Sequence, residues 1–237
     1  MAFKPPAASK RQLDGVDFGK ADDFATAAKK RFDAFDKTGT RDPNKCKALL
    51  KFPDEAAVFW SSKMAIDTDG PSAGKGRPSG KQLDPNPGDA TDETTFHFAD
   101  GTFLPSEIVP YVVLPQSGPN SGKPFDRLVQ IGDMAVVIFG DKTVAAICGD
   151  FGPHRKIGEA SIRVHEALQQ QGLPDPCARR SDKGFCLKTR NSSVDENVLF
   201  FVFPGSKFEP HELTLSNINT MVKARAFGLY NKLRGAS

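Results

Sequence analysis

Short apolar runs separated by turn residues recur along the second half of the chain, and they predict β-strands. The runs at 134–139 and 143–148 flank Gly140-Asp141, a pair that favours a two-residue hairpin turn. The segment 196–206 begins with a nearly continuous apolar run, which is typical of a buried strand. This half of the chain is therefore predicted to be mainly β.

Two earlier segments also fit strands, and a long loop lies between them. Residues 55–67 are expected to form one or two strands, and residues 107–115 carry β-branched side chains bounded by prolines. The intervening segment 67–95 is rich in Gly, Pro, Asp and Ser, which predicts a loop. Loops of this length in compact domains usually carry function or move.

Three segments repeat their apolar residues at helical spacing instead: 21–39, 159–171 and 215–235. Many short strands with three helices predict a mainly β fold. We expect a barrel or sandwich core with added helices at the N-terminus, after the "GDFGP" loop and at the C-terminus. Residues 1–20 lack periodicity and are predicted to be a flexible tail ahead of a single domain at 21–237.

Composition and charge fit a soluble globular protein. The chain has 237 residues, of which 38% are hydrophobic and 26% are charged. A net charge of +3, from scattered basic residues, gives no reason to expect a nucleic-acid partner. No apolar run reaches the ~18 residues of a membrane helix, so no membrane partner is expected, and we expect a monomer.

The N-terminus, "MAFKPPAASKRQLDG", has no apolar segment of the kind found in signal peptides. The localisation therefore stays open among a cytoplasmic protein, export by an unusual route and a chain that lacks its leader. The four cysteines contain no Cys-x-x-Cys spacing, so zinc is not expected. Cys177 and Cys186 bracket a loop and are equally compatible with a disulfide and with free buried thiols.

The stretch "GDFGPHRKIGEAS" at 149–161 carries the strongest candidate chemistry. Asp150 and Glu159 flank a Gly-Pro bend between a predicted strand and a predicted helix. Hydrolysis of a glycosidic bond needs two carboxyl groups, one to protonate the leaving oxygen and one to activate a water or attack the sugar. The structural alternative is that Asp150 stabilises the turn and Glu159 favours a helix N-terminus.

Other polar residues near these acids are weaker candidates. Asp67 and Asp69 in "MAIDTDG" resemble the start of a calcium loop but lack its further ligands, so an acidic loop is favoured and no metal site is expected. His154 and Lys156 lie between the two candidate acids and are predicted to contact a substrate. His165, on the predicted helix, is expected to be solvated.

Several stretches, taken together and in order, resemble the fungal-type chitosanases of glycoside hydrolase family 75, which also occur in bacteria. They lie between about residues 55 and 206 and read "SSKMAIDTDGP", "PYVVLP", "GDMAVVIFGDKTVAAICGDFGP", "KIGEASIRVHEAL" and "FFVFPGS". The resemblance implies that Asp150 and Glu159 are the essential acids of the family's "GD-x-GP" and "GEAS" region. The family's N-terminal acidic motif corresponds to Asp67 and Asp69.

The resemblance also implies a reaction. Such chitosanases cleave β-1,4 links between glucosamine units within the chitosan chain, invert the anomeric carbon and use no cofactor. Asp67 and Asp69 would then bind ammonium groups of the substrate through charge-assisted hydrogen bonds. Inversion requires the two catalytic carboxyl groups to stand roughly 6.5–9.5 Å apart, so that a water fits between them and the sugar.

A wider likeness to double-psi β-barrel proteins, including endoglucanases, expansins and lytic transglycosylases, bears on the roles of the acids. It implies that Glu159 is the general acid and that the base is Asp150 or an acid of the 67–69 loop. A helix N-terminus at Glu159 would oppose this role, because it lowers the pKa of a carboxyl group. Two other functions stay open: a hydrolase of another amino-sugar polymer such as peptidoglycan, and a non-catalytic carbohydrate-binding barrel.

Overall fold

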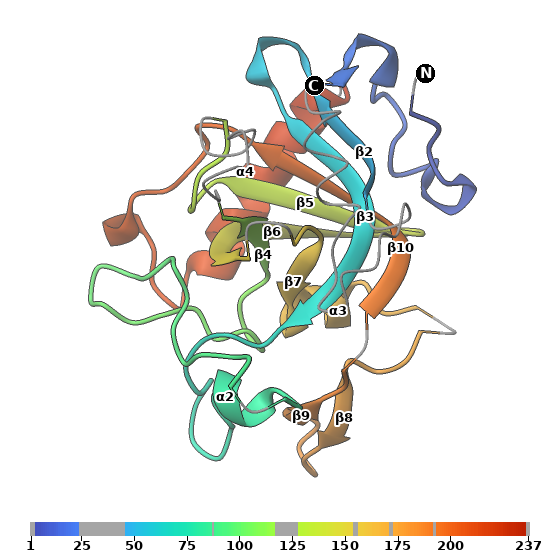
Figure 1. Ribbon diagram of the computed structural model, residues 1–237. Helices are drawn as coiled ribbons and strands as arrows, with labels where there is room; N and C mark the ends of the chain where they lie inside the picture. Colours follow the sequence, from blue (N-terminus) through green and yellow to red (C-terminus); the bar gives the residue numbers. More distant parts are fainter. Residues whose placement is uncertain are drawn as a thin grey trace.

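A closed six-stranded β-barrel forms the body of the computed structural model (Figure 1). The structure describes residues 3–23, 46–86, 88–116, 128–153, 156–170, 173–191 and 193–235. In order around the barrel, the strands are β3 (Val58–Asp67), β10 (Ser193–Phe203), β5 (Met134–Phe139), β6 (Lys142–Gly152), β4 (Tyr111–Pro115) and β7 (Glu159–Ser161). The predicted mainly β fold is confirmed.

The β5–β6 hairpin and strand β10 confirm the predictions from the apolar runs. Phe139 pairs with Lys142 across the two-residue turn, where Gly140 has a φ of +56°. Such a left-handed conformation favours glycine, because other residues meet a steric penalty there. β10 lies between β3 and β5 and pairs with both, which explains why its sequence is so uniformly apolar.

Barrel closure depends on strand β3, whose two halves have different neighbours. Its first half pairs with β2 (Cys46–Lys51), which in turn pairs with β1 (Asp22–Asp23). Its last three residues pair in parallel with β7, from Ala65 with Glu159 to Asp67 with Ser161. Gly158 permits this approach, since a Cβ added there would lie 2.0 Å from the carbonyl oxygen of Lys63.

Alternating side chains of the strands divide between two apolar clusters. On β10, Phe200 stacks on Trp60 with ring centroids 5.1 Å apart, whereas the next residue, Phe201, contacts Phe59 at 4.8 Å. This period of two is what a strand with apolar groups on both faces requires. Helix α4 (Ile218–Leu233) covers the Phe201 cluster and confirms the C-terminal helix.

The helix expected over 159–171 begins later than predicted. Glu159–Ser161 form strand β7, and helix α3 spans Ile162–Ala167. The side chain of Ser161 explains the change, because its hydroxyl accepts a hydrogen bond from the Val164 N–H and acts as the helix N-cap. The prediction that placed Glu159 at a helix N-terminus was therefore wrong.

The remaining elements are short. In the expected long loop lies α2 (Gly80–Leu83), and strands β8 (Cys177–Arg180) and β9 (Cys186–Thr189) form a separate hairpin. A disulfide joins Cys177 and Cys186, which settles the alternative that the sequence left open. Four 3-10 turns complete the described elements: η1 (Ala7–Ser9), η2 (Phe18–Lys20), η3 (Pro53–Glu55) and η4 (Pro210–Glu212).

The segment ahead of β1, expected to be a loose tail, packs against the barrel. The rings of Phe3 and Phe18 lie 4.9 and 5.1 Å from that of Phe59. The helix expected over 21–39 does not begin as predicted, because Asp22–Asp23 form strand β1, and its remainder from residue 24 onward lies outside the described residues. Within the described ranges, none of the helices combines the length and apolar character that crossing a membrane requires.

Candidate active site

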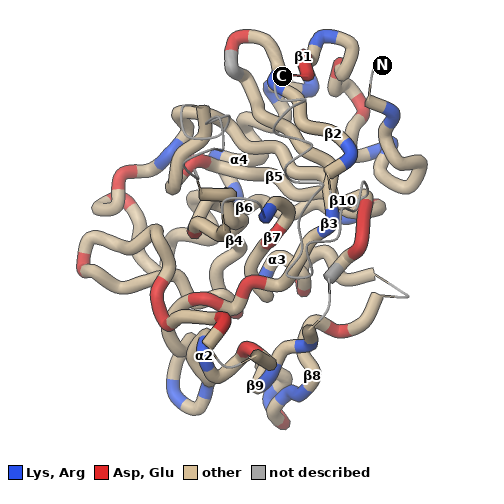
Figure 2. The backbone as a smooth tube through the Cα atoms, in the orientation of Figure 1, with Lys and Arg blue, Asp and Glu red and all other residues tan. Residues whose placement is uncertain are grey.

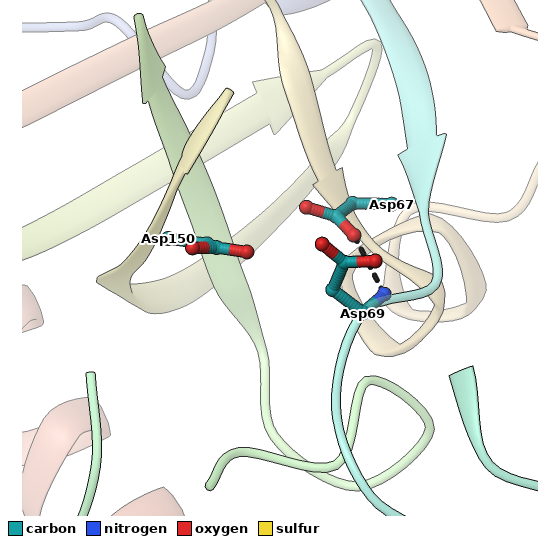
Figure 3. Close-up of side chains that lie close together, drawn as sticks. All are labelled: Asp67, Asp69 and Asp150. Carbon is teal, nitrogen blue, oxygen red and sulfur yellow. Dashed lines mark hydrogen bonds between the residues drawn. The ribbon is translucent and has the colours of Figure 1, made fainter. Parts of the chain in front are cut away.

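Three aspartates from strand ends meet at one end of the barrel (Figure 3). Asp67 is the last residue of β3, Asp69 follows it, and Asp150 lies near the end of β6, where it pairs with Val113 of β4. One carboxyl oxygen from each lies within 4.8 Å of the others. Residues more than 80 positions apart are thus brought together by the closure of the barrel.

Hydrogen bonds hold each of these carboxyl groups in place. The Asp69 N–H donates to Asp67 Oδ1 at 2.7 Å, and the Thr91 N–H donates to Asp69 Oδ1 at 2.8 Å. Asp150 Oδ1 accepts three hydrogen bonds, from the N–H and hydroxyl of Thr95 at 2.9 and 2.6 Å and from the Phe151 N–H at 2.8 Å. The geometry of the cluster is therefore set largely by backbone donors.

The cluster retains protons that isolated carboxyl groups would lose. Burial raises the pKa of Asp67 well above its usual range, and the charges of Glu159 and Asp69 add to this. Burial raises the pKa of Asp69 to about 7, although its hydrogen bond from Thr91 acts in the opposite direction. Burial also raises the pKa of Asp150, against the hydrogen bonds from Thr95. The charges of Asp150 and Glu159 also raise the pKa of Asp69.

Tyr111 packs beside the cluster and forms a hydrogen bond to the backbone of Asp69. Its hydroxyl donates to the carbonyl oxygen of Asp69 at 2.9 Å, and its side chain is fully buried. Burial, with the charge of Asp67, raises the pKa of the Tyr111 hydroxyl well above its usual range. The phenol therefore stays neutral and acts as a hydrogen-bond donor.

Glu159 approaches the cluster from β7. Its ammonium partner is Lys156, three residues earlier, which forms an ion pair with Glu159 Oε1. On the opposite side lies Gly152, where an added Cβ would stand 3.2 Å from Glu159 Oε2. Glu159 is the first residue of β7 and lies two residues before Ser161, the N-cap of α3, so it is not part of the helix that the sequence predicted.

A groove of about 1070 Å³ opens over these acids. Its described lining holds six acidic and three basic residues, so it is acidic although the whole chain carries a charge of +3. Figure 2 shows acidic positions near the end of β3 and around α2. The acidic lining residues are Asp67, Asp69, Asp84, Asp89, Glu159 and Asp195, and the basic ones are Lys63, Lys156 and Arg190.

The family described as fungal chitosanase of glycosyl hydrolase group 75 matches residues 64–227 of the 237. The chain belongs to this family. No curated protein matches it. As a member of group 75, the protein is a glycoside hydrolase, and the activity of its family is the hydrolysis of the polysaccharide chitosan.

The fold of this group 75 hydrolase brings most of the predicted site residues together. Asp67, Asp69, Lys156 and Glu159 line the groove, and Asp150 lies beside Asp69. His154 lies outside the described residues. His165 is not solvated as predicted: it is buried, its Nε2 lies 2.9 Å from the carbonyl oxygen of Ala65, and burial lowers its pKa to about 4.

Sequence reasoning missed the residues that hold the acids in place. Thr91, Thr95 and Tyr111 supply hydrogen bonds to the aspartates, and none of them belongs to a motif that signals this role. Lys63 was also missed, although its position two residues before Ala65 on β3 places it on the same face as Asp67. Strand periodicity starting from Asp67 is the signal that would have found it.

The aspartate cluster is also close enough to surround a cation. However, each of the three carboxyl groups already accepts a backbone N–H. These hydrogen bonds account for the arrangement, and we assign no metal ligand.

Proposed function

We propose that the protein cleaves β-1,4 glucosamine linkages within chitosan chains by an inverting mechanism, with Asp150 and Glu159 as the essential carboxyl groups. The observation that carries this proposal is the convergence of both family-motif acids on one acidic groove. Glu159 lines the groove, and Asp150 lies in one carboxyl cluster with Asp67 and Asp69, which both line it. One carboxyl unit gives a proton to the leaving oxygen, and the other takes a proton from the attacking water.

The electrostatics of the groove support acid–base hydrolysis. Burial raises the pKa of Asp69 to about 7 and also raises the pKa of Asp150, so a carboxyl group of this cluster can supply the proton that the leaving oxygen needs. Glu159 forms an ion pair with the ammonium group of Lys156.

The acidic lining supports a polycationic substrate. Asp67 and Asp69 line the groove beside Asp150, and we propose that they bind glucosamine ammonium groups by charge-assisted hydrogen bonds. His154 and Lys156 complete the proposed binding set through hydroxyl groups of the sugar. We also propose that the protein acts as a monomer.

Time-resolved NMR of a glucosamine oligomer tests the reaction and its stereochemistry together. Wild-type protein is expected to release new reducing ends as the α-anomer first, and an initial β-anomer would refute inversion. Glu159→Gln and Asp150→Asn should each abolish turnover while the melting temperature stays near that of the wild type. Asp182→Asn, at an exposed acid outside the groove, is the matched control and should keep full activity.

A comparison of substrates tests which polymer the protein hydrolyses. Turnover of chitosan, with little or none on chitin and peptidoglycan, is the expected result. Binding of chitosan without turnover would instead indicate a carbohydrate-binding barrel. Azide added to the Glu159→Ala and Asp150→Ala variants then identifies the base, because a small anion can replace the missing water-activating carboxylate but not a missing acid.

A further inference from the structure

Phe151 is exposed, whereas nearly all large apolar side chains of the described residues are buried or half-buried. Its exposed fraction is 37%, and among the described residues the one other exposed large hydrophobic side chain is Leu215, at 46%. Phe59, Phe200 and Phe201 are fully buried. Leaving an aromatic ring in water forgoes the free energy of burial. An exposed ring in a groove lined mainly by polar groups therefore points to a ligand with an apolar face.

The position of Phe151 places it at the chemistry. It lines the groove and lies directly between Asp150 and Gly152 on strand β6. Its N–H donates to Asp150 Oδ1 at 2.8 Å and to Thr95 Oγ1 at 3.2 Å. The backbone that carries the ring is thus fixed by the same contacts that fix the proposed catalytic acid.

We propose that Phe151 is a stacking platform for a sugar ring next to the bond that is cleaved. A pyranose ring presents an apolar C–H face, whereas its hydroxyl and ammonium groups project from its edge. An aromatic ring packs against such a face, and the acids of the groove lie where the polar edge needs partners. This inference rests on the proposed function and adds to it a binding residue that no sequence motif indicated.

Steady-state kinetics on a soluble glucosamine hexasaccharide tests the platform. For Phe151→Ala, KM is expected to rise about tenfold because the ring face is lost, with kcat within about twofold of the wild type. Phe151→Trp keeps an aromatic face and should restore KM to near the wild-type value. Leu215→Ala, the matched change at an exposed apolar residue outside the groove, should leave both constants unchanged.

Phe151→Leu separates the aromatic face from apolar bulk. It is expected to resemble Phe151→Ala, and a Leu variant with wild-type KM would overturn the stacking role. An unchanged KM in Phe151→Ala would overturn the proposal outright. A loss confined to kcat would also overturn it, because it would mean that the ring only supports the geometry of Asp150.

Calorimetric binding of the same oligomer isolates recognition from chemistry. In a Glu159→Gln background, adding Phe151→Ala should weaken affinity by about tenfold, matching the change in KM. Failure of the two proposals is distinguishable: a wild-type protein that leaves chitosan intact refutes the proposed function. If the wild-type protein cleaves chitosan and Phe151→Ala has the same KM and affinity, only the stacking role of Phe151 is refuted.

Discussion

Asp67 is buried among carboxyl groups, where an ionised side chain is costly to the folded state. Its folded pKa is raised above the unfolded value of 3.8 by burial and by Glu159. A raised carboxyl pKa contributes stability that is complete below the unfolded pKa and is lost as pH rises through the folded pKa. The acid cluster should therefore make the protein less stable at neutral and alkaline pH than at about pH 4.

Asp67→Asn tests this linkage. The amide keeps an acceptor for the Asp69 N–H but carries no charge, so the melting temperature at pH 8 should rise by roughly 4–8 °C, the shift from about 2 kcal/mol in a domain of this size. Near pH 4 the gain should shrink toward zero, because the wild-type carboxyl is then protonated too. Calorimetry across pH measures both. A gain of equal size at both pH values would contradict a charge effect, and Asp182→Asn controls for the loss of an exposed acid.

Gly152 leaves room for Glu159. An added Cβ would stand 3.0 Å from Val113 Cγ1 and 3.2 Å from Glu159 Oε2, so Gly152→Ala must push one of them by a few tenths of an ångström. We expect kcat to fall about tenfold or more, since small displacements of a catalytic group are costly to the rate. Gly228→Ala is the control. Its Cβ meets nothing within 4 Å on helix α4, so activity should hold and stability should rise by roughly 0.5–1 kcal/mol. Equal kcat in both variants would show that Glu159 tolerates the displacement.

At the scale of elements, the sequence predicted the helices and strands whose conformation depends on residues close together in the chain. The β5–β6 hairpin, β10 and α4 follow from apolar period and turn residues. Strand β7 could not be predicted this way. Its three residues are too few to show a repeating apolar pattern, and their extended conformation depends on pairing with β3 and β4. His165 was misjudged for the same reason, since its partner is the carbonyl group of Ala65 on a distant strand.

The disulfide of the β8–β9 hairpin supports one wall of the groove. Thr189, the last residue of β9, lines the groove together with Arg190 and Asn191, which follow it. Cys186 also donates its N–H to Glu107 Oε1. Replacing Cys177 and Cys186 together by Ala should lower stability by about 2–3 kcal/mol for a loop this short. KM should rise while kcat changes little, because the proposed acids lie on other strands. Reductant should reproduce the change in the wild type and have no further effect on the double variant. An unaltered KM would mean that the hairpin does not contribute to substrate binding.

At the scale of the whole molecule, closure of the barrel creates the site. The acids at 67–69 and those at 150–159 are separate in sequence, and only the pairing of β3 with β7 and of β4 with β6 sets them side by side. The sequence alone indicated Asp150 and Glu159 as a candidate acid pair beside a structural alternative, and the resemblance to a family was needed to favour their catalytic role and to add Asp67 and Asp69. The supporting residues Thr91, Thr95 and Tyr111 come from loops and a strand that carry no motif of their own.

The N-terminal segment joins this barrel to its C-terminal helix. The Tyr230 hydroxyl donates to the carbonyl oxygen of Gln12 at 2.7 Å, Arg234 Nε donates to that of Asp14 at 2.5 Å, and the ring of Phe18 packs among other phenylalanines. We propose a single domain from residue 21 onward, and these contacts favour a folding unit in which residues 3–20 fold together with it. The sequence predicted a tail here because its apolar residues are few and follow no period.

Phe18→Ala tests whether the segment belongs to that unit. Removing a buried phenylalanine should destabilise the protein by about 3–5 kcal/mol, whereas Lys20→Ala, at an exposed position two residues on, should have almost no effect. At temperatures well below the melting transition, the Phe18→Ala variant should keep its activity. Phe18 packs on Phe59, and β3 runs about 26 Å from Phe59 to Asp67 in the groove, so the lost contact is far from the site. Chemical denaturation and chitosan turnover measure the two quantities. Equal stability of the two variants would mean that the segment is the flexible tail its sequence suggests, and a parallel loss of activity would mean that its packing reaches the groove.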